Sequence, residues 1–212
     1  MNIVLLGLPG AGKGTQAKII VNHLSIPHIS TGDLFRQAYQ AKTELGLRAK
    51  EFMDKGELIP DEVTIGLAFS RIGEVDCARG FLLDGFPRNL NQARALRNYL
   101  DSGSKQIRHV VYVEVDENLL LERLTGRRVC VGCGTTFHLI YNPPANDNAC
   151  DCCNGEIIQR EDDREETVKE RLKINKELTH KLVQFYGDEG ILRKVDGAKG
   201  IDEVTKDVLG LF

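Results

Sequence analysis

Short, mostly apolar runs alternate with longer amphipathic stretches along most of this chain. The apolar runs cover residues 3–6, 80–83, 110–115 and 191–195. Stretches with helical spacing occupy residues 14–24, 61–75, 89–101, 117–126, 164–186 and 202–209. Short apolar strands that alternate with helices are typical of a parallel sheet buried on both faces. The pattern therefore predicts an α/β fold in which helices cover both faces of a parallel sheet.

Two segments depart from this alternation. Residues 30–59 have helical spacing and no convincing strand, whereas residues 127–163 are rich in Cys, Pro, Asn, Asp and Gly and lack an amphipathic helix. We interpret both as insertions. The predicted organisation is a core domain made of residues 1–29, 60–126 and 164–212, interrupted by the insertions 30–59 and 127–163.

Composition narrows the functional classes only slightly. The chain has 212 residues, of which 28% are charged, and a formal net charge of −3. This length allows one sizeable core, and this charge gives no overall attraction to nucleic acid or an anionic membrane. The N-terminus lacks the basic and apolar regions of a signal peptide, and there is no run of about 18 apolar residues. We therefore expect a soluble, cytoplasmic protein.

A glycine-rich segment with the sequence GLPGAGKGT, residues 7–15, follows the first apolar run. Glycines let successive backbone N–H groups turn toward an anion, and the helix that follows adds the positive end of its dipole. Lys13 reaches the β- and γ-phosphates, and Thr15 offers a hydroxyl to a magnesium ion. Gly14 places Thr15 one position later than in the strict phosphate-loop pattern. A βα turn without a ligand is the alternative, which four glycines and a lysine in nine residues disfavour.

An acidic residue, Asp84, ends the second apolar run and is followed by Gly85, Phe86, Pro87 and Arg88. A carboxylate at the carboxyl end of a parallel strand, beside a phosphate loop, is suited to bind magnesium directly or through water. The alternative is that Asp84 caps the helix that begins near residue 89 and that Arg88 is solvated.

Five of the six cysteines lie between residues 130 and 153. Cys130 and Cys133 are separated by two residues, as are Cys150 and Cys153, and sixteen residues lie between the pairs. This spacing predicts a structural zinc site of four thiolates. We expect Cys152 to be a free thiol. His138 as a substitute ligand and a redox-active dithiol are the weaker alternatives.

These motifs together resemble those of the nucleoside monophosphate kinases, and of the adenylate kinases above all. The GKGT ending of the glycine-rich segment, TGDLFR at residues 31–36, GELIPDEV at 56–63 and DGFPR at 84–88 followed by Gln92 are similar to family motifs. GRR at 126–128 and DDR at 162–164 resemble the borders of the long lid of this family. The match covers nearly the whole chain. Some bacterial long-lid members carry zinc in the lid.

The resemblance implies a P-loop core with an NMP-binding insertion at 30–59 and a zinc lid at 127–163. It implies a monomer that catalyses Mg-ATP + AMP ⇌ 2 ADP and maintains the balance of adenine nucleotides. The implied ATP-binding residues are Gly10, Ala11, Gly12, Lys13, Gly14, Thr15, Arg127, Thr136, Phe137 and Lys199. The implied AMP-binding residues are Thr31, Arg36, Glu57, Leu58, Ile59, Gly85, Phe86, Pro87, Arg88, Gln92, Arg160 and Arg171. The implied catalytic residues are Lys13, Asp84, Arg88, Arg123, Arg127, Arg160 and Arg171.

Two other functions remain open at this point. One is a related kinase that accepts UMP or CMP, or that uses GTP as the donor; the long lid and Gln92 favour AMP as the acceptor. The other is a zinc ribbon that binds nucleic acid. Segment 127–163 has three arginines against six acidic residues, Asp147 among them, whereas a module that grips a phosphate backbone should be basic.

Overall fold

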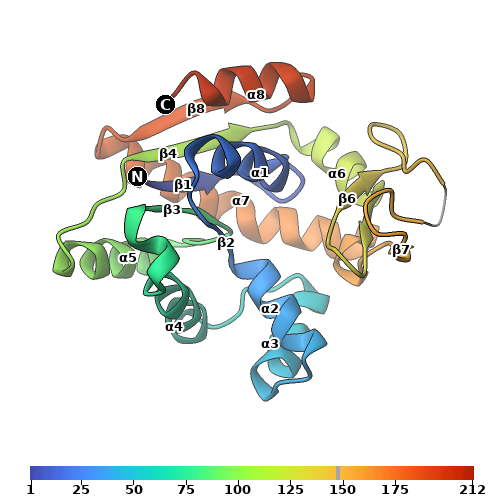
Figure 1. Ribbon diagram of the computed structural model, residues 1–212, viewed down its shortest axis with the longest axis horizontal. Helices are drawn as coiled ribbons and strands as arrows, with labels where there is room; N and C mark the ends of the chain where they lie inside the picture. Colours follow the sequence, from blue (N-terminus) through green and yellow to red (C-terminus); the bar gives the residue numbers. More distant parts are fainter. Residues whose placement is uncertain (147–148) are drawn as a thin grey trace.

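A parallel sheet forms the centre of the molecule, as the sequence predicts. The computed structural model describes residues 1–146 and 149–212, so Asp147 of the lid lies outside the described residues. Within those ranges five strands pair in parallel (Figure 1). Their order across the sheet is β2 (His28–Ser30), β3 (Phe81–Asp84), β1 (Asn2–Leu6), β4 (His109–Glu114) and β8 (Leu192–Asp196).

Helices cover both faces of this sheet. Consecutive residues of β1 point to opposite faces, as the pleat of a strand requires. Val4 and Leu6 pack in one cluster with α4 (Asp61–Ile72), α5 (Leu90–Ser102) and α7 (Glu165–Asp188). Ile3 and Leu5 pack in a second cluster with α1 (Lys13–Leu24) and α8 (Ile201–Leu209). A third cluster joins α6 (Glu117–Thr125) to α7 and to the loop after β1.

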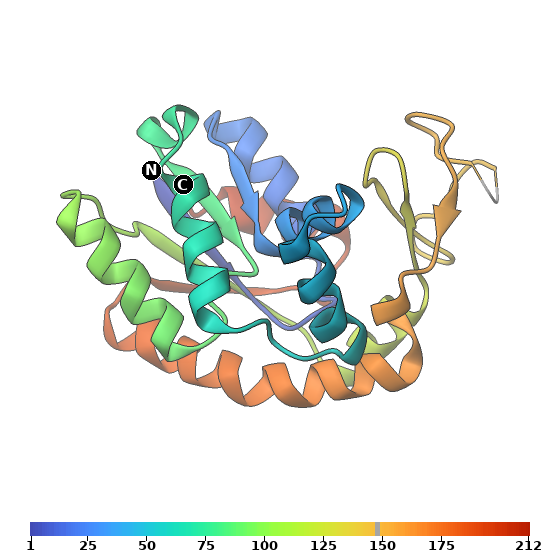
Figure 2. The ribbon, with the colours of Figure 1, turned by 90° about the horizontal axis from the view of Figure 1, so that it is seen from below.

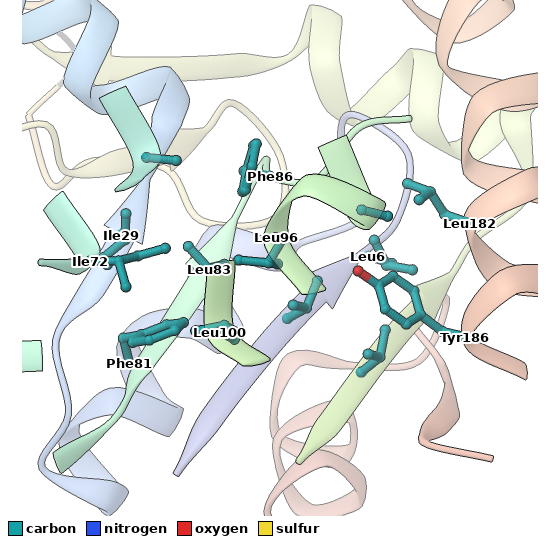
Figure 3. Packing of buried hydrophobic residues seen from close by; sticks show 14 of the residues in the cluster. Leu6, Ile29, Ile72, Phe81, Leu83, Phe86, Leu96, Leu100, Leu182 and Tyr186 are labelled. Carbon is teal, nitrogen blue, oxygen red and sulfur yellow. The ribbon is translucent and has the colours of Figure 1, made fainter. Parts of the chain in front are cut away.

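The first of these clusters holds the strand ends in place. Figure 3 shows Phe81 and Leu83 of β3 beside Leu96 and Leu100 of α5, and these four side chains are at most 2% exposed. Burying a side chain of this size contributes roughly 1.5–3 kcal/mol. The carboxyl ends of β1 and β3 are therefore fixed by a dense core, and the loops that leave them start from a rigid platform.

The first predicted insertion contains two helices, α2 (Thr31–Gln40) and α3 (Glu44–Lys55), which cross closely. A Cβ at Gly46 would lie 2.2 Å from the backbone of Ala38 and Tyr39, so only glycine permits this crossing. The sequence predicted no strand in residues 30–59. This prediction was wrong at the first of these residues, because Ser30 is the last residue of the short strand β2. The helix predicted for residues 61–75 also ends early, at Ile72, and a 3₁₀ turn, η1 (Val75–Arg79), follows.

The second predicted insertion lies at one end of the molecule, where α7 connects it to the core (Figure 2). It contains an antiparallel sheet with the order β6 (Thr136–His138), β5 (Arg127–Cys130) and β7 (Ile157–Ile158), followed by the 3₁₀ turn η2 (Glu161–Asp163). The sequence pattern does not predict these short strands. Among the described residues, no helix is long and apolar enough to cross a membrane.

Candidate active site and metal centre

The glycine-rich segment forms a tight loop between β1 and α1. Gly10 and Gly12 have φ angles of +86° and +89°, which favour glycine. Gly10 also packs against α6, where a Cβ would lie 2.9 Å from the Leu124 side chain. Lys13 Nζ donates hydrogen bonds to the carbonyls of Gly7 (2.8 Å) and Leu8 (3.0 Å). The loop therefore has the shape of a phosphate cradle, and Lys13 folds back over it.

This loop lies in a cleft of about 1160 Å³. The cleft brings together basic side chains from the core and from both predicted insertions. All the arginines singled out from the sequence line it. They are Arg36 of α2, Arg88 after β3, Arg123 of α6, Arg127 of β5, Arg160 before η2 and Arg171 of α7.

Burial and neighbouring positive charges lower the pKa values of three cations in this cleft, Lys13, Arg88 and Arg160. Burial above all, together with the charges of Arg88, Arg171 and Arg127, outweighs the opposing charge of Asp84 and lowers the pKa of Lys13 to about 8. Burial and Arg171 lower the pKa of Arg88 to about 10. Burial and Arg36 do the same for Arg160, also to about 10. Such a site favours a multiply charged anion, because the anion would relieve this mutual repulsion.

Two carboxylates hold the arginines at the border of the lid. Asp163 is fully buried and accepts hydrogen bonds from Arg127 Nε (2.7 Å) and an Arg171 guanidinium nitrogen (3.1 Å). Asp162 Oδ2 lies 3.1 Å from the same nitrogen of Arg171. Burial alone lowers the pKa of Arg127, but the charge of Asp163 and its hydrogen bonds outweigh this effect and raise the pKa. These acidic residues fix Arg127 and Arg171 in orientation.

The residues predicted to bind AMP lie around the turn after β3. The carbonyl of Gly85 accepts hydrogen bonds from Thr31 Oγ1 and Arg88 Nε, both at 2.9 Å. Arg36 pairs with Asp33, and Gln92 Oε1 accepts from the backbone N–H of Arg88. Glu57, Leu58 and Ile59, between α3 and α4, line the cleft together with Pro87.

Phe86 is the exception among these residues. Its side chain is fully buried in the core and packs edge-to-face on Phe69, with the ring centroids 6.3 Å apart. Gly85, Pro87 and Arg88 line the cleft, and Phe86 does not. The Phe86 side chain therefore anchors this turn to the core.

The residues predicted to bind ATP lie along the loop and at the opposite end of the cleft. Gly12, Gly14 and Thr15 line it beside Lys13, and Thr136 and Phe137 reach it from β6. Gly10, Ala11 and Lys199 also line it, and Lys199 pairs with Asp207. Arg123 donates to the carbonyl of Gly197 (2.8 Å), whereas Arg127 and Arg171 share Asp163. Arg123 thus lies beside the segment that leads to Lys199.

Asp84 ends β3 beneath the glycine-rich loop, next to His28, a residue that no sequence motif indicates. His28 Nε2 lies 3.5 Å from Asp84 Oδ2 and has no hydrogen-bond partner among the described residues. Burial raises the pKa of Asp84, but His28 and the charge of Lys13 outweigh it and hold the pKa below its ordinary value. The carboxylate is therefore ionised at neutral pH, as a magnesium ligand must be.

Four cysteine sulfurs meet in the lid, and they are the four chosen from the spacing. Cys130 Sγ and Cys153 Sγ are 3.4 Å apart, Cys133 Sγ and Cys150 Sγ are 3.5 Å apart, and all four lie within 4.8 Å of one another. Thiolates bound to one zinc ion at about 2.3 Å would be roughly 3.8 Å apart. The donor set therefore fits zinc. Cys152 is exposed and is not part of the cluster.

Comparisons with known proteins agree with this geometry. The family model described as adenylate kinase matches residues 5–191. The adenylate kinase of Bacillus licheniformis is 57% identical over 212 residues, which is 100% of this chain and 98% of that protein. Those of a Geobacillus species and of Staphylococcus aureus are 54% and 53% identical over 100% of this chain, covering 98% and 99% of the relatives. The chain therefore belongs to the adenylate kinase family.

Proposed function

We propose that this protein transfers the terminal phosphoryl group of Mg-ATP reversibly to AMP, giving two ADP. The observation that carries the proposal is the single cleft in which a phosphate loop and basic side chains from the core and both predicted insertions converge. Phosphoryl transfer needs little covalent chemistry from the protein. It needs two nucleotides in line and positive charge around the transferring group.

The two ends of the cleft suit two different nucleotides. The donor phosphates would lie in the glycine-rich loop against Lys13, with the donor base toward Phe137 and Lys199. The acceptor would lie near Thr31 and Gln92, with its phosphate toward Arg36 and Arg88. The backbone of residues 57–59 and 85–88 would also contact the acceptor. Of these residues, all except Phe86 line the cleft.

Arginines between these ends would stabilise the transferring group. Arg127, Arg160 and Arg171 come from the border of the lid, and Arg88 comes from the core. A guanidinium can grip two phosphate oxygens at once, which favours arginine over lysine for this task. In related reactions a single such arginine contributes roughly 10³–10⁵ in rate. Arg123 lies close enough to Gly197 to act on the donor side.

Two metals belong to this proposal, in different roles. Magnesium would neutralise charge on the ATP phosphates, with Asp84 binding it directly or through water and Thr15 nearby. Zinc would be held by Cys130, Cys133, Cys150 and Cys153. A site closed by four thiolates has no open position for substrate, so this zinc would be structural.

An assay of acceptors tests the assignment. The purified protein is given ATP and magnesium with AMP, UMP, CMP or GMP in turn, then ATP and AMP without magnesium, and finally GTP and magnesium with AMP. We expect AMP to be preferred strongly and the rate to collapse when magnesium is omitted. A preference for UMP or CMP would refute the acceptor, and a preference for GTP over ATP would refute the donor.

A further inference from the structure

Asp61 begins α4 and lies outside the cleft, yet it contacts the residue proposed to meet the acceptor base. Asp61 Oδ1 accepts a hydrogen bond from Gln92 Nε2 at 2.7 Å. Gln92 itself lines the cleft and is 1% exposed, whereas Asp61 is not among the lining residues. Any effect of Asp61 on the acceptor must therefore act through Gln92.

The side-chain amide of Gln92 is held from both ends. At one end, Nε2 donates a hydrogen bond to the Asp61 carboxylate, which can only accept. At the other end, Oε1 accepts a hydrogen bond from the backbone N–H of Arg88 at 2.8 Å. Turning the amide over would set its oxygen against the Asp61 carboxylate and its N–H groups against the Arg88 N–H. Both contacts would be repulsive, so one orientation of the Gln92 amide is fixed.

This fixed orientation determines what the amide has left to offer. A glutamine amide has two N–H donors and two acceptor positions. One donor is used by Asp61 and one acceptor position by Arg88, which leaves one N–H and one acceptor position as the edge that the amide can offer to a base. Adenine presents an amino donor at C6 and an acceptor at N1, and so complements this edge. A 6-oxopurine presents an acceptor at C6 and a donor at N1, and so opposes it.

We propose that Asp61 is a positioning residue that locks the Gln92 amide and thereby makes the acceptor site prefer adenine to 6-oxopurines. The inference rests on the proposed function, because it requires AMP to be the acceptor. Asp61 also accepts from Asn89 Nδ2 (2.8 Å) and Asn91 Nδ2 (2.7 Å), which join the starts of α4 and α5. A purely structural role for Asp61 is therefore the competing explanation, and the test must separate the two.

The test compares AMP with IMP, which share the phosphoribose and differ in the donor and acceptor order of the base. Asp61→Asn is nearly isosteric and supplies an N–H that can meet a turned Gln92 oxygen. Hydrogen bonds to charged groups are among the stronger ones, so we expect the ratio of kcat/KM for AMP to that for IMP to fall by about tenfold. The loss should appear mainly in KM for AMP, with kcat little changed.

Matched variants control for charge and for local structure. Glu62→Gln removes an exposed carboxylate one position along α4, and Asn91→Ala removes a hydrogen bond to the other oxygen of Asp61. Neither should change the ratio. Asp61→Ala is the second test variant, and thermal unfolding sets an assay temperature at which all variants are folded. In ¹⁵N–¹H NMR spectra, the Gln92 side-chain amide protons should shift in Asp61→Asn and stay in place in Glu62→Gln.

The outcomes are distinguishable. A wild-type protein that does not phosphorylate AMP would refute the proposed function itself. A wild type that prefers AMP, together with Asp61 variants in which AMP and IMP lose activity equally or the ratio is unchanged, would refute the positioning role alone. A fall in the ratio confined to the Asp61 variants is the result that the structure predicts.

Discussion

Asp163 offers the sharpest test of how the lid border is held together. This fully buried carboxylate binds both Arg127 and Arg171, which are themselves only 20% and 16% exposed. Asp163→Asn keeps the shape of the side chain and removes its charge, so two largely buried guanidinium groups lose a shared counter-ion. Removing one partner of a buried ion pair costs about 3–5 kcal/mol.

The neighbouring Asp162 sets where in this range the effect should fall. Its carboxylate stays 3.1 Å from Arg171, so one of the two arginines keeps a partner. We therefore expect the lower value, about 3 kcal/mol. For a chain of this size each kcal/mol corresponds to roughly 2–4 °C, so the unfolding temperature should fall by about 6–12 °C.

The assay is thermal unfolding followed by circular dichroism, with zinc at the same concentration throughout. Glu161→Gln is the matched control, because Glu161 lies in the same turn and pairs with Arg164 while both are more than half exposed. An exposed pair of this kind contributes about 0–1 kcal/mol. Equal shifts for Asp163→Asn and Glu161→Gln would refute the reasoning.

Three further predictions follow from the site. Cys130→Ser should lose zinc and lower the unfolding temperature, whereas Cys152→Ser should do neither, which metal analysis of the purified variants decides. Arg88→Ala should reduce kcat by about 10³-fold or more, and the exposed Arg94→Ala should not; near-full activity of Arg88→Ala would contradict the placement of Arg88 at the transferring group. Because the pKa of Lys13 is lowered to about 8, Lys13 loses its proton in the free protein as the pH rises through that value, while the unfolded chain keeps it to about 10.5. The contribution of Lys13 to the free energy of unfolding should therefore increase as the pH rises between these two values. ATP binding near pH 9 should be accompanied by proton uptake in the wild type but not in Lys13→Met, as calorimetry in buffers of different ionisation enthalpy would show.

The sequence predicted the parts of the molecule whose signals are local. Apolar strands and amphipathic helices follow from periodicity, and the glycine-rich loop and the two cysteine pairs follow from spacing within a few residues. The strand β2 was missed because His28–Ser30 is too short to show any periodicity. The lid strands β5, β6 and β7 were missed for the same reason, since they are two to four residues long.

The parts of the site that the sequence did not predict depend on contacts between distant residues. His28 meets Asp84 across two strands, and Asp61 meets Gln92 across two helices, with no motif linking either pair. Arg123, which the resemblance implies to be catalytic, donates a hydrogen bond to the carbonyl of Gly197, 74 residues away, and no motif indicates this contact. Such pairings arise from the packing of the core, which no short window of sequence contains.

The most direct test of the central claim starts from a single nucleotide. The protein is incubated with ADP and magnesium alone, and the products are followed by ³¹P NMR. If the cleft holds two adenine nucleotides and transfers a phosphoryl group between them, ATP and AMP should appear in equal amounts until equilibrium is reached. Persistence of ADP, or its conversion to AMP and inorganic phosphate without ATP, would contradict the account.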